Sequence, residues 1–531
     1  MSHEALTRRD LFRGTSAGLA VGLFSGLQPE AAEASPSVSG LKPKFLPLSE
    51  LSSLQAPFSQ STDRVAHLLH RTGYGVRRGE LEAARALGVE GWLDQQLDPE
   101  GIDDRAVESA VEDLFPSLRL SAPELLALSD EREDGGWENA MELKRATLYR
   151  ALFSKRQLYE VMVEFWTNHF SIYHFKDVCS DLKTVDDRDV IRPHALGRFR
   201  DLLHASAKSP AMLYYLDNYA NVADGPNENY ARELMELHTI GVDAGYTQQD
   251  VEEVARCFTG WTITIWQYNG QDGLYRYDRR LHDEGPKTVL GQAIRGGRPG
   301  ALDARKVLDI LASHPACARF ISFKLCRRFV SDNPPASIVD AAAATFRATD
   351  GDIKAVLRTI LTSDEFFAAA EQKLKRPFEF LISALRSMDA RVKAPEGLDS
   401  LVWMLYPLGQ VPFEWEPPNG YPDAGGAWAN TNGLLNRWNV GSILTLNWWD
   451  GLTVPVRALV KATRATTPAQ LVDGFAQMLL QRGLDAPDRE RLIAFTTLDR
   501  SPTAPAPGWF LNRQAPALLA LLLGSPYFQW R

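Results

Sequence analysis

The sequence has 531 residues, of which 45% are hydrophobic and 24% are charged. This composition excludes a disordered or low-complexity chain and is typical of a globular protein with a sizeable core. The formal net charge is −9, and no run rich in lysine or arginine stands out to neutralise phosphates, which argues against nucleic acid as a partner.

The first 34 residues have the pattern of an export signal. Thr7-Arg8-Arg9-Asp10-Leu11-Phe12 is a twin-arginine motif, a mildly apolar run covers residues 14–27, and Ala32-Glu33-Ala34 is a small-residue cleavage site. The apolar run is too short and too rich in glycine and serine for a permanent membrane anchor. We therefore expect cleavage after Ala34 and a periplasmic or extracellular protein, exported by the twin-arginine translocation machinery and without a stable anchor. Such signals resemble those of proteins that fold, often around a cofactor, before export.

The remainder divides into a leader and a mainly helical domain. Residues 35–62 are rich in Ser, Pro and Leu without periodicity and predict an extended or disordered leader. From residue 63 to 531 helical patterns dominate: Asp63 can cap a first helix, residues 138–158 are strongly amphipathic, and Thr247 opens a capping box. We predict a large, mainly α-helical globular domain, with a division into two lobes near 370–400 as an open alternative.

Two segments interrupt the helical pattern. Residues 261–268 alternate β-branched and aromatic side chains, Asn269-Gly270 is a turn signal, and residues 274–278 can return as the partner strand, which predicts a small β-hairpin insertion near 261–290. Residues 409–423 are rich in Pro, Gly and Trp and too irregular for a regular element. A loop of this length is typical of a functional segment or a packed cap.

Residues 227–241 are the most informative stretch. An asparagine at the start and a glycine at the end are typical of helix termini. At about 100° per residue, His238 lies on the buried face, Glu233 at its margin and Glu236 on the other side, where Arg232 can pair with it. A buried imidazole near carboxylates can form a metal or acid/base site, although a lone buried histidine is more often a core residue bonded to the backbone.

A second helix repeats this pattern. The apolar stripe of residues 158–170 includes His169, and Glu164 lies on the opposite side. The cysteines form no Cys-x-x-Cys pair, so buried free thiols are the default interpretation and one disulfide stays open. The four cysteines are Cys179, Cys257, Cys317 and Cys326.

Several segments together resemble the bacterial family catalogued as domain of unknown function 1800. The resemblance extends from about residue 63 to the C-terminus. It implies an exported, mostly helical bacterial protein and assigns no reaction. Members of this family are often encoded beside a sulfatase-like family, which makes a sulfatase-like protein a candidate partner. The segments that carry the resemblance are residues 165–170, 227–241, 246–261, 282–283, 375–377, 409–410, 418–420 and 525–529.

Histidines and acids from separate segments predict a metal site. Imidazole nitrogens and carboxylate oxygens are ligands of zinc, iron and manganese, so His169, His238 and His282 are candidate ligands. Asp283 is a further ligand or an orienting catalytic group, and Glu233 a ligand or general base. The corresponding function is an exported enzyme that depends on a divalent metal, either a hydrolase or an oxidoreductase.

Two other functions remain open. A non-catalytic surface or matrix assembly factor would use the same histidines and Arg–Glu pairs as structural braces. A glycan-acting helical enzyme would combine paired carboxylates with aromatic rings that stack on sugars. No serine-hydrolase, Walker or Rossmann glycine pattern is visible. The tryptophans that permit the glycan interpretation are Trp403, Trp415, Trp428, Trp438, Trp448 and Trp449.

Overall fold

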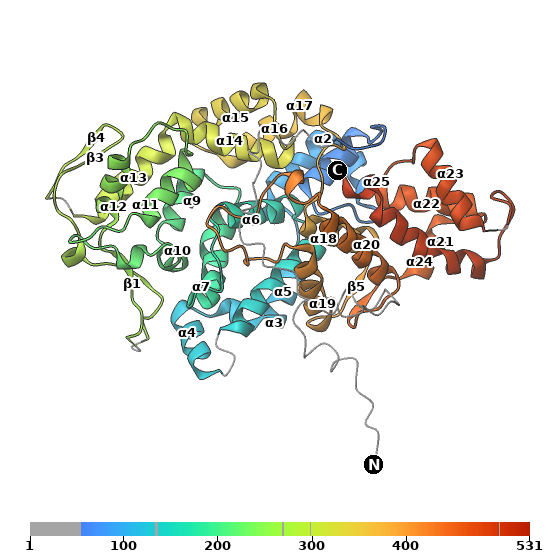
Figure 1. Ribbon diagram of the computed structural model, residues 1–531, viewed down its shortest axis with the longest axis horizontal. Helices are drawn as coiled ribbons and strands as arrows, with labels where there is room; N and C mark the ends of the chain where they lie inside the picture. Colours follow the sequence, from blue (N-terminus) through green and yellow to red (C-terminus); the bar gives the residue numbers. More distant parts are fainter. Residues whose placement is uncertain (1–54, 133–135, 268–269, 298, 499) are drawn as a thin grey trace, which may run out of the picture. The chain divides into compact units, whose positions relative to one another are not determined.

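The computed structural model describes residues 55–132, 136–267, 270–297, 299–498 and 500–531 (Figure 1). By its internal contacts the chain divides into residues 1–52 and a second unit, residues 53–531, which contains all the described residues. The predicted signal peptide and the first part of the leader lie outside the described residues, and the predicted domain boundaries stay predictions.

The second unit is mainly α-helical, which confirms the predicted fold class. Two of its short helices, η4 (Asp187–Ile191) and η6 (Leu234–Thr239), are π-helices. The α-helices are α1 (Arg64–Thr72), α2 (Glu80–Leu97), α3 (Arg105–Leu114), α4 (Ala122–Glu131), α5 (Trp137–Phe153), α6 (Gln157–His169), α7 (Cys179–Asp186), α8 (Arg192–His194), α9 (Phe199–Ser206), α10 (Pro210–Tyr215), α11 (Asn229–Glu233), α12 (Gln248–Phe258), α13 (Ala301–Ser313), α14 (Pro315–Phe329), α15 (Ala336–Ala348), α16 (Ile353–Leu361), α17 (Asp364–Ala368), α18 (Pro377–Ser387), α19 (Glu396–Leu408), α20 (Thr431–Thr445), α21 (Val456–Thr463), α22 (Pro468–Leu480), α23 (Ala486–Thr497), α24 (Gly508–Gly524) and α25 (Pro526–Gln529).

The strands form small antiparallel pairs. β1 (Trp261–Ile263) pairs with β2 (Tyr275–Tyr277), with Trp261 opposite Tyr277, which confirms the predicted hairpin. Part of its predicted turn, Asn269, lies outside the described residues. β3 (Lys287–Val289) pairs with β4 (Gln292–Ile294), and β5 (Arg391–Val392) pairs with β6 (Leu452–Thr453). The sequence pattern did not predict these last two pairs.

Local capping explains where several helices begin. The Asp63 carboxylate accepts a hydrogen bond from the Ala66 amide at 2.8 Å, as expected for the start of α1. Thr247 and Asp250 form the predicted capping box of α12. The prediction of one helix over residues 138–158 was wrong, because the chain breaks between α5 and α6. At this break the Asp104 carboxylate accepts hydrogen bonds from the Ser154 hydroxyl and the Lys155 amide.

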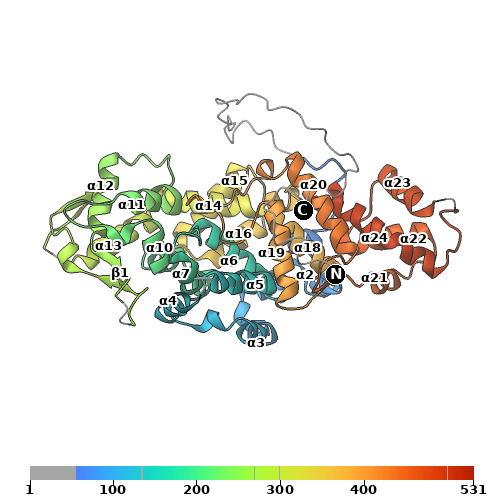
Figure 2. The same cartoon turned by 60° about the horizontal axis from the view of Figure 1, so that its bottom comes forward.

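Helix α6 lies within the hydrophobic core and contacts α1, α2, α5 and η4. Its apolar stripe is buried as predicted, and the neighbouring Trp166 indole donates to the Ala195 carbonyl at 2.9 Å. After α19 the chain passes beside the C-terminal end of α6, where the Asn168 amide bonds the Tyr421 backbone. Figures 1 and 2 both place α20, α22 and α24 next to one another, away from α10 to α13. Among the described helices, none is long and apolar enough to cross a bilayer.

Candidate functional site

His169 and His238 meet in the core beside a lysine. Their ring centroids lie 6.0 Å apart, and both side chains are buried. His169 Nε2 lies 3.0 Å from the His238 carbonyl oxygen, which can only accept, so Nε2 carries the proton. His169 Nδ1 is then free to accept from Lys324 Nζ at 2.8 Å. The buried Nε2 of His238 has no hydrogen-bond partner within the described part of the chain.

Burial sets the charge of this cluster. It lowers the pKa of His169 well below its usual value, and Lys324 adds to the effect. The same two causes, in the same order, lower the pKa of His238 to about 3. Burial also lowers the pKa of Lys324 to about 8, although Asp423 partly opposes this. Both imidazoles are therefore neutral at pH 7.

The helix that carries His238 differs from the predicted one. It is α-helical only over α11 and continues as the π-helix η6, so a wheel of 100° per residue does not describe it. Glu236 makes the predicted pair with Arg232, at 3.6 Å, and also accepts from the Tyr246 hydroxyl at 2.7 Å. Glu233 is half-buried, and burial, then Glu236, raises its pKa. Within the described residues Glu233 makes no hydrogen bond or ion pair with either histidine.

His282 occupies a different centre. Its Nδ1 donates to the Thr259 carbonyl at 2.8 Å, and its Nε2 faces Lys287 Nζ at 3.3 Å and Asp303 Oδ2 at 3.4 Å. The Lys287 ammonium donates to Asp303 Oδ2 at 2.9 Å and to the Asp283 carbonyl oxygen. Lys287 is fully buried. Its ammonium thus contacts three acceptors, His282 Nε2, Asp303 Oδ2 and the Asp283 carbonyl oxygen.

Asp283 does not turn its carboxylate toward His282. Its two oxygens accept from Arg256 Nε and Nη2 at 2.7 and 3.2 Å, and this pairing lowers the pKa of Asp283. The structure therefore brings His169 together with His238 and leaves His282 and Asp283 at a separate centre. No group of three or more His, Cys, Asp or Glu side chains within the described ranges is placed to hold a metal ion. Metal binding stays a prediction. The cysteines within the same ranges are free and buried.

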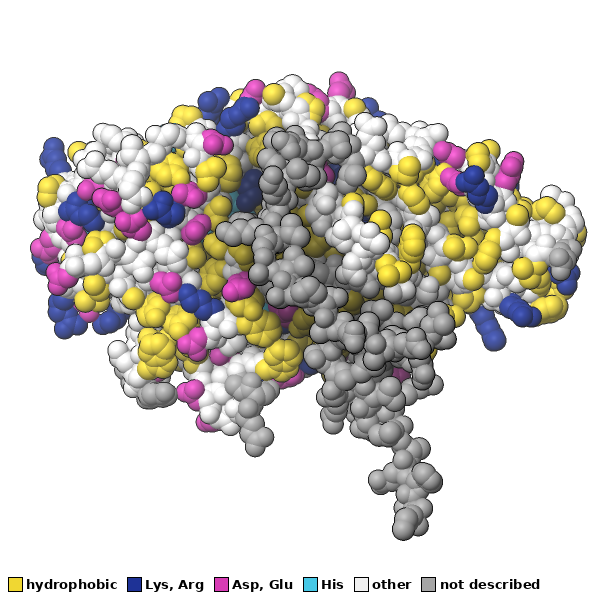
Figure 3. Space-filling view, viewed as in Figure 1, with side chains coloured by type: hydrophobic (Ala, Val, Ile, Leu, Met, Phe, Trp, Pro, Cys, Tyr) yellow, Lys and Arg dark blue, Asp and Glu magenta, His cyan; other side chains and the backbone are white. Residues whose placement is uncertain are grey.

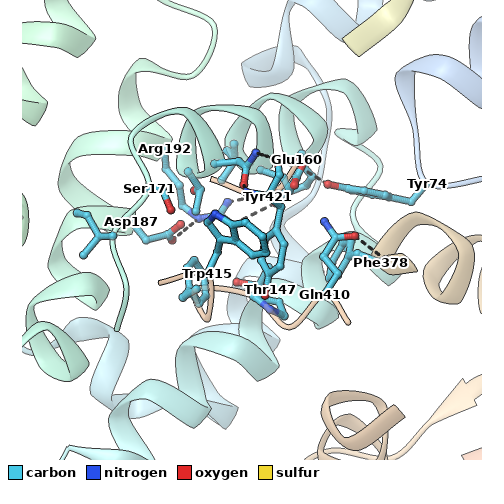
Figure 4. Close-up of a pocket in the computed structure, with 18 residues that line it drawn as sticks. Tyr74, Thr147, Glu160, Ser171, Asp187, Arg192, Phe378, Gln410, Trp415 and Tyr421 are labelled. Carbon is cyan, nitrogen blue, oxygen red and sulfur yellow. Dashed lines mark hydrogen bonds and ion pairs between the residues drawn. The ribbon is translucent and has the colours of Figure 1, made fainter. Parts of the chain in front are cut away.

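A pocket opens on another side of α6 (Figure 4). Most of its lining comes from α5, α6, η4 and residues 410–421, with Arg192 of α8 and Phe378 of α18, and its volume is about 60 Å³. This is room for a few water molecules or the edge of a larger ligand. Aromatic rings dominate one side, with Trp415 and Tyr421 at a centroid distance of 4.9 Å. The pocket combines apolar walls with a few polar groups, as ligand sites do.

Buried ion pairs form the polar side of the pocket. Arg192 donates to both oxygens of Glu160 at 3.1 Å and to Asp187 Oδ2 at 2.8 Å. Burial disfavours the charge on Asp187, but Arg192 and then Lys183 outweigh it and lower the pKa of Asp187. Asp187 is therefore held ionised, and its carboxylate is a hydrogen-bond acceptor. The Glu160 carboxylate also accepts from Arg192.

The 409–423 loop is fastened to the pocket by its backbone. Asn168 Oδ1 accepts from the Tyr421 amide at 2.7 Å, and Asn168 Nδ2 donates to the Tyr421 carbonyl at 2.8 Å. Gly420 has a φ of +71°, and a Cβ there would lie 2.1 Å from the Asn168 carbonyl oxygen. Gln410 Oε1 accepts from the Phe378 amide at 3.1 Å. The loop is thus both a packed cap and a pocket wall.

A buried arginine cluster contacts the pocket residue Glu164. Glu379 accepts from Arg328, Arg376 and Arg531; burial opposes its charge, but these guanidinium groups keep its pKa well below the usual value. Arg376 Nη2 also donates to Glu164 Oε2 at 2.6 Å. Glu164, at the pocket, is therefore an ion-paired group.

The sequence analysis missed Glu160, Asp187 and Arg192. A signal was present, because Glu160 and Glu164 are spaced by four on a helix whose other positions are largely apolar. Because they lie on one side of α6, this side could have been expected to contact polar groups elsewhere in the protein. Arg192 and Asp187 come from segments that only the fold brings to α6.

Comparison with known protein families places the chain in one of them. Residues 67–530 match the family model described as "Protein of unknown function (DUF1800)". The chain belongs to this family, which confirms the resemblance seen in the sequence. No curated protein and no solved structure matches it significantly.

Proposed function

We propose that this chain is an exported carbohydrate-binding protein whose site is the pocket between α6 and the 409–423 loop. The observation that carries the proposal is an aromatic wall, Trp415 and Tyr421, on a loop that is fastened through its backbone. This wall faces the buried carboxylates of Glu160 and Asp187. Pyranose rings present an apolar face that packs on aromatic rings and hydroxyl groups that donate to carboxylates.

The pocket volume and charge state shape this proposal. A volume of about 60 Å³ admits the edge of a sugar unit, so the remainder of a glycan would lie over Trp415 in solvent. Arg192 pairs with both carboxylates and, against the effect of burial, lowers the pKa of Asp187, whereas a glycosidase needs one carboxylic acid that can donate a proton. These features favour binding over cleavage. A glycan-binding protein of this kind is compatible with a role in surface or matrix assembly.

Tryptophan fluorescence and calorimetry with a panel of soluble oligosaccharides test the proposal. We expect saturable binding of at least one oligosaccharide, weakened tenfold or more by Trp415→Ala or Glu160→Gln. Trp266→Ala is the matched control, because Trp266 is 54% exposed on the β1–β2 hairpin and does not line the pocket. Absence of any saccharide binding by the folded protein, or wild-type affinity of Trp415→Ala, would overturn the proposal.

A metal-dependent enzyme is the second candidate. One observation favours it: the buried, unpartnered Nε2 of His238 lies close to His169. Elemental analysis of the purified protein tests it against the His169→Ala/His238→Ala double variant. Stoichiometric zinc, iron or manganese that disappears in a still-folded variant would support the enzyme. Metal-free wild type purified after export would remove this candidate.

Export by the twin-arginine route and a periplasmic or extracellular location belong to the same proposal. Their support is the motif Arg8-Arg9 with its apolar run and cleavage site. Replacement of both arginines by lysine should leave the precursor in the cytoplasm, which cell fractionation measures. Co-purification tests the candidate association with a sulfatase-like protein encoded nearby.

A further inference from the structure

Three neighbouring helices carry basic residues and no acidic ones. Helix α24 contacts both α20 and α21, and none of the three contains an aspartate or a glutamate. The whole sequence has 67 acidic residues and a net charge of −9. The local charge of these helices is therefore positive, in contrast to the net charge of the chain.

Large apolar side chains are exposed on this surface. Leu435, Trp438 and Leu446 follow a spacing of three and eight along and just beyond α20, which places them on one face. Their exposed fractions are 49%, 53% and 61%. Leu521 of α24 is 44% exposed. We call these four residues the apolar face. In Figure 3 hydrophobic side chains gather on the part of the molecule where Figure 1 places α20, α22 and α24.

Trp438 joins the two helices into one surface. Its indole Nε1 donates to the Gly524 carbonyl at 2.8 Å, and a Cβ at Gly524 would lie 2.7 Å from the Trp438 ring. The ring therefore lies directly over the end of α24, one turn from Leu521. The close approach of α20 and α24 makes the exposed side chains of both helices neighbours.

Unpaired cations accompany the apolar face. Arg513 shares the exposed side of α24 with Leu521, at a spacing of eight residues, and Arg457 and Lys461 are exposed and spaced by four on α21. Within the described residues none of these three makes an ion pair with a carboxylate. Leucine and tryptophan beside lysine and arginine, without acids, are typical of surfaces that bind anionic lipid headgroups and insert side chains below them.

We propose that the apolar face docks this protein on an anionic phospholipid bilayer. Trp438, Leu435, Leu446 and Leu521 enter the headgroup region, and Arg457, Lys461 and Arg513 contact lipid phosphates. Charge complementarity favours an anionic lipid as the partner, because Arg457, Lys461 and Arg513 are exposed and have no carboxylate partner within the described residues. This inference is independent of the glycan site.

Flotation with vesicles tests the proposal on the full chain without its signal. We expect binding to vesicles of phosphatidylglycerol and phosphatidylethanolamine, little binding to phosphatidylcholine, and weaker binding as salt increases. Leu435→Gln/Leu446→Gln should lower the apparent affinity at least tenfold, and Lys461→Gln/Arg513→Gln should lower it on anionic vesicles. Trp266→Gln, an equally exposed tryptophan outside the apolar face, should bind as wild type.

Circular dichroism and thermal unfolding must first show that each variant is folded. Wild-type affinity of the folded Leu435→Gln/Leu446→Gln variant would overturn the proposal, as would a folded wild type that binds no anionic vesicle. Sedimentation velocity tests whether a second copy of the chain, and not a lipid bilayer, binds the apolar face. A dimer that the same double variant abolishes, without vesicle binding, would assign the apolar face to self-association and would also overturn the proposal.

Discussion

Two buried lysine–histidine clusters in this molecule have similar side chains and different electrostatics. At His282 the ammonium of Lys287 lies 2.9 Å from the Asp303 carboxylate. At His169 the ammonium of Lys324 donates to an imidazole nitrogen at 2.8 Å, and no carboxylate within the described ranges forms an ion pair with it. The pKa of Lys324 falls accordingly, to about 8.

The difference teaches what a buried cation needs. A carboxylate and a carbonyl oxygen offset the desolvation of Lys287, so its ammonium is a paired structural brace, although Asp303 Oδ1 has no partner within the described residues. An imidazole offers Lys324 only a neutral acceptor, and burial lowers the pKa of Lys324 to about 8. The same cluster contains a nitrogen without a hydrogen-bond partner within the described residues, His238 Nε2. Within the described residues each cluster thus retains one buried atom without a hydrogen-bond partner, His238 Nε2 in the one and Asp303 Oδ1 in the other.

The largest expected loss of stability comes from removing the ammonium of Lys287 from the His282 cluster. Lys287→Met leaves the buried Asp303 carboxylate without its partner and should lower the free energy of unfolding by about 3–5 kcal/mol. Urea denaturation measures this loss. The double variant Lys287→Met/Asp303→Asn should recover part of it. A loss below about 1 kcal/mol in the single variant would contradict the interpretation of Lys287 as a brace.

The cluster of His169, His238 and Lys324 should instead make the stability of the protein depend on pH. The pKa of His238 is about 3 in the folded protein, against a usual value of 6.5. Between these values the unfolded chain binds the proton and the folded chain does not, so stability falls as pH drops from about 6.5. His238→Asn should reduce this slope by about one proton, or ~1.4 kcal/mol per pH unit.

Urea denaturation of wild type and His238→Asn at pH 6.5, 5.5 and 4.5 measures the two slopes. Carboxylates with lowered pKa values, such as Glu379, also lose stability in acid, but they are common to both proteins and cancel in the difference. Parallel slopes would mean that His238 takes up a proton in the folded state.

The smallest effect is expected from Lys324→Met. The ammonium has no carboxylate partner within the described residues, so its removal should change the free energy of unfolding by no more than about 1 kcal/mol in either direction. The pKa values of His169 and His238 should increase, because Lys324 contributes to lowering both. Denaturation and NMR titration of the imidazoles measure these changes. A loss of stability as large as that of Lys287→Met would contradict the interpretation that the two lysines differ in how strongly they stabilise the fold.

Much of the fold could be predicted because it depends on local chemistry. The cap at Asp63, the capping box at Thr247 and the β1–β2 hairpin follow from short-range hydrogen bonds and side-chain alternation. The break between α5 and α6 could not be predicted, because it is stabilised by hydrogen bonds to Asp104, which lies more than forty residues earlier in the chain. The π-helix η6 was missed because α-helical spacing was assumed.

The candidate site was predicted less completely. Burial of His169 and His238 follows from helix periodicity, and the structure brings them together. The separation of His282 from them could not be foreseen, because it depends on which loop packs on which helix. Lys287 and Lys324, which decide the charge of the two clusters, lie in segments that gave no motif.

By itself the sequence determined the family, the mainly helical fold and the buried faces of the central helices, because each depends on residues close together in the chain. Only the tertiary structure decided which polar groups share an environment: Glu160 with Asp187 and Arg192 under Trp415, Lys287 with Asp303, and Lys324 with two imidazoles. The physical reason is that desolvation and ion pairing depend on distances in space, and those distances arise when segments far apart in sequence pack together.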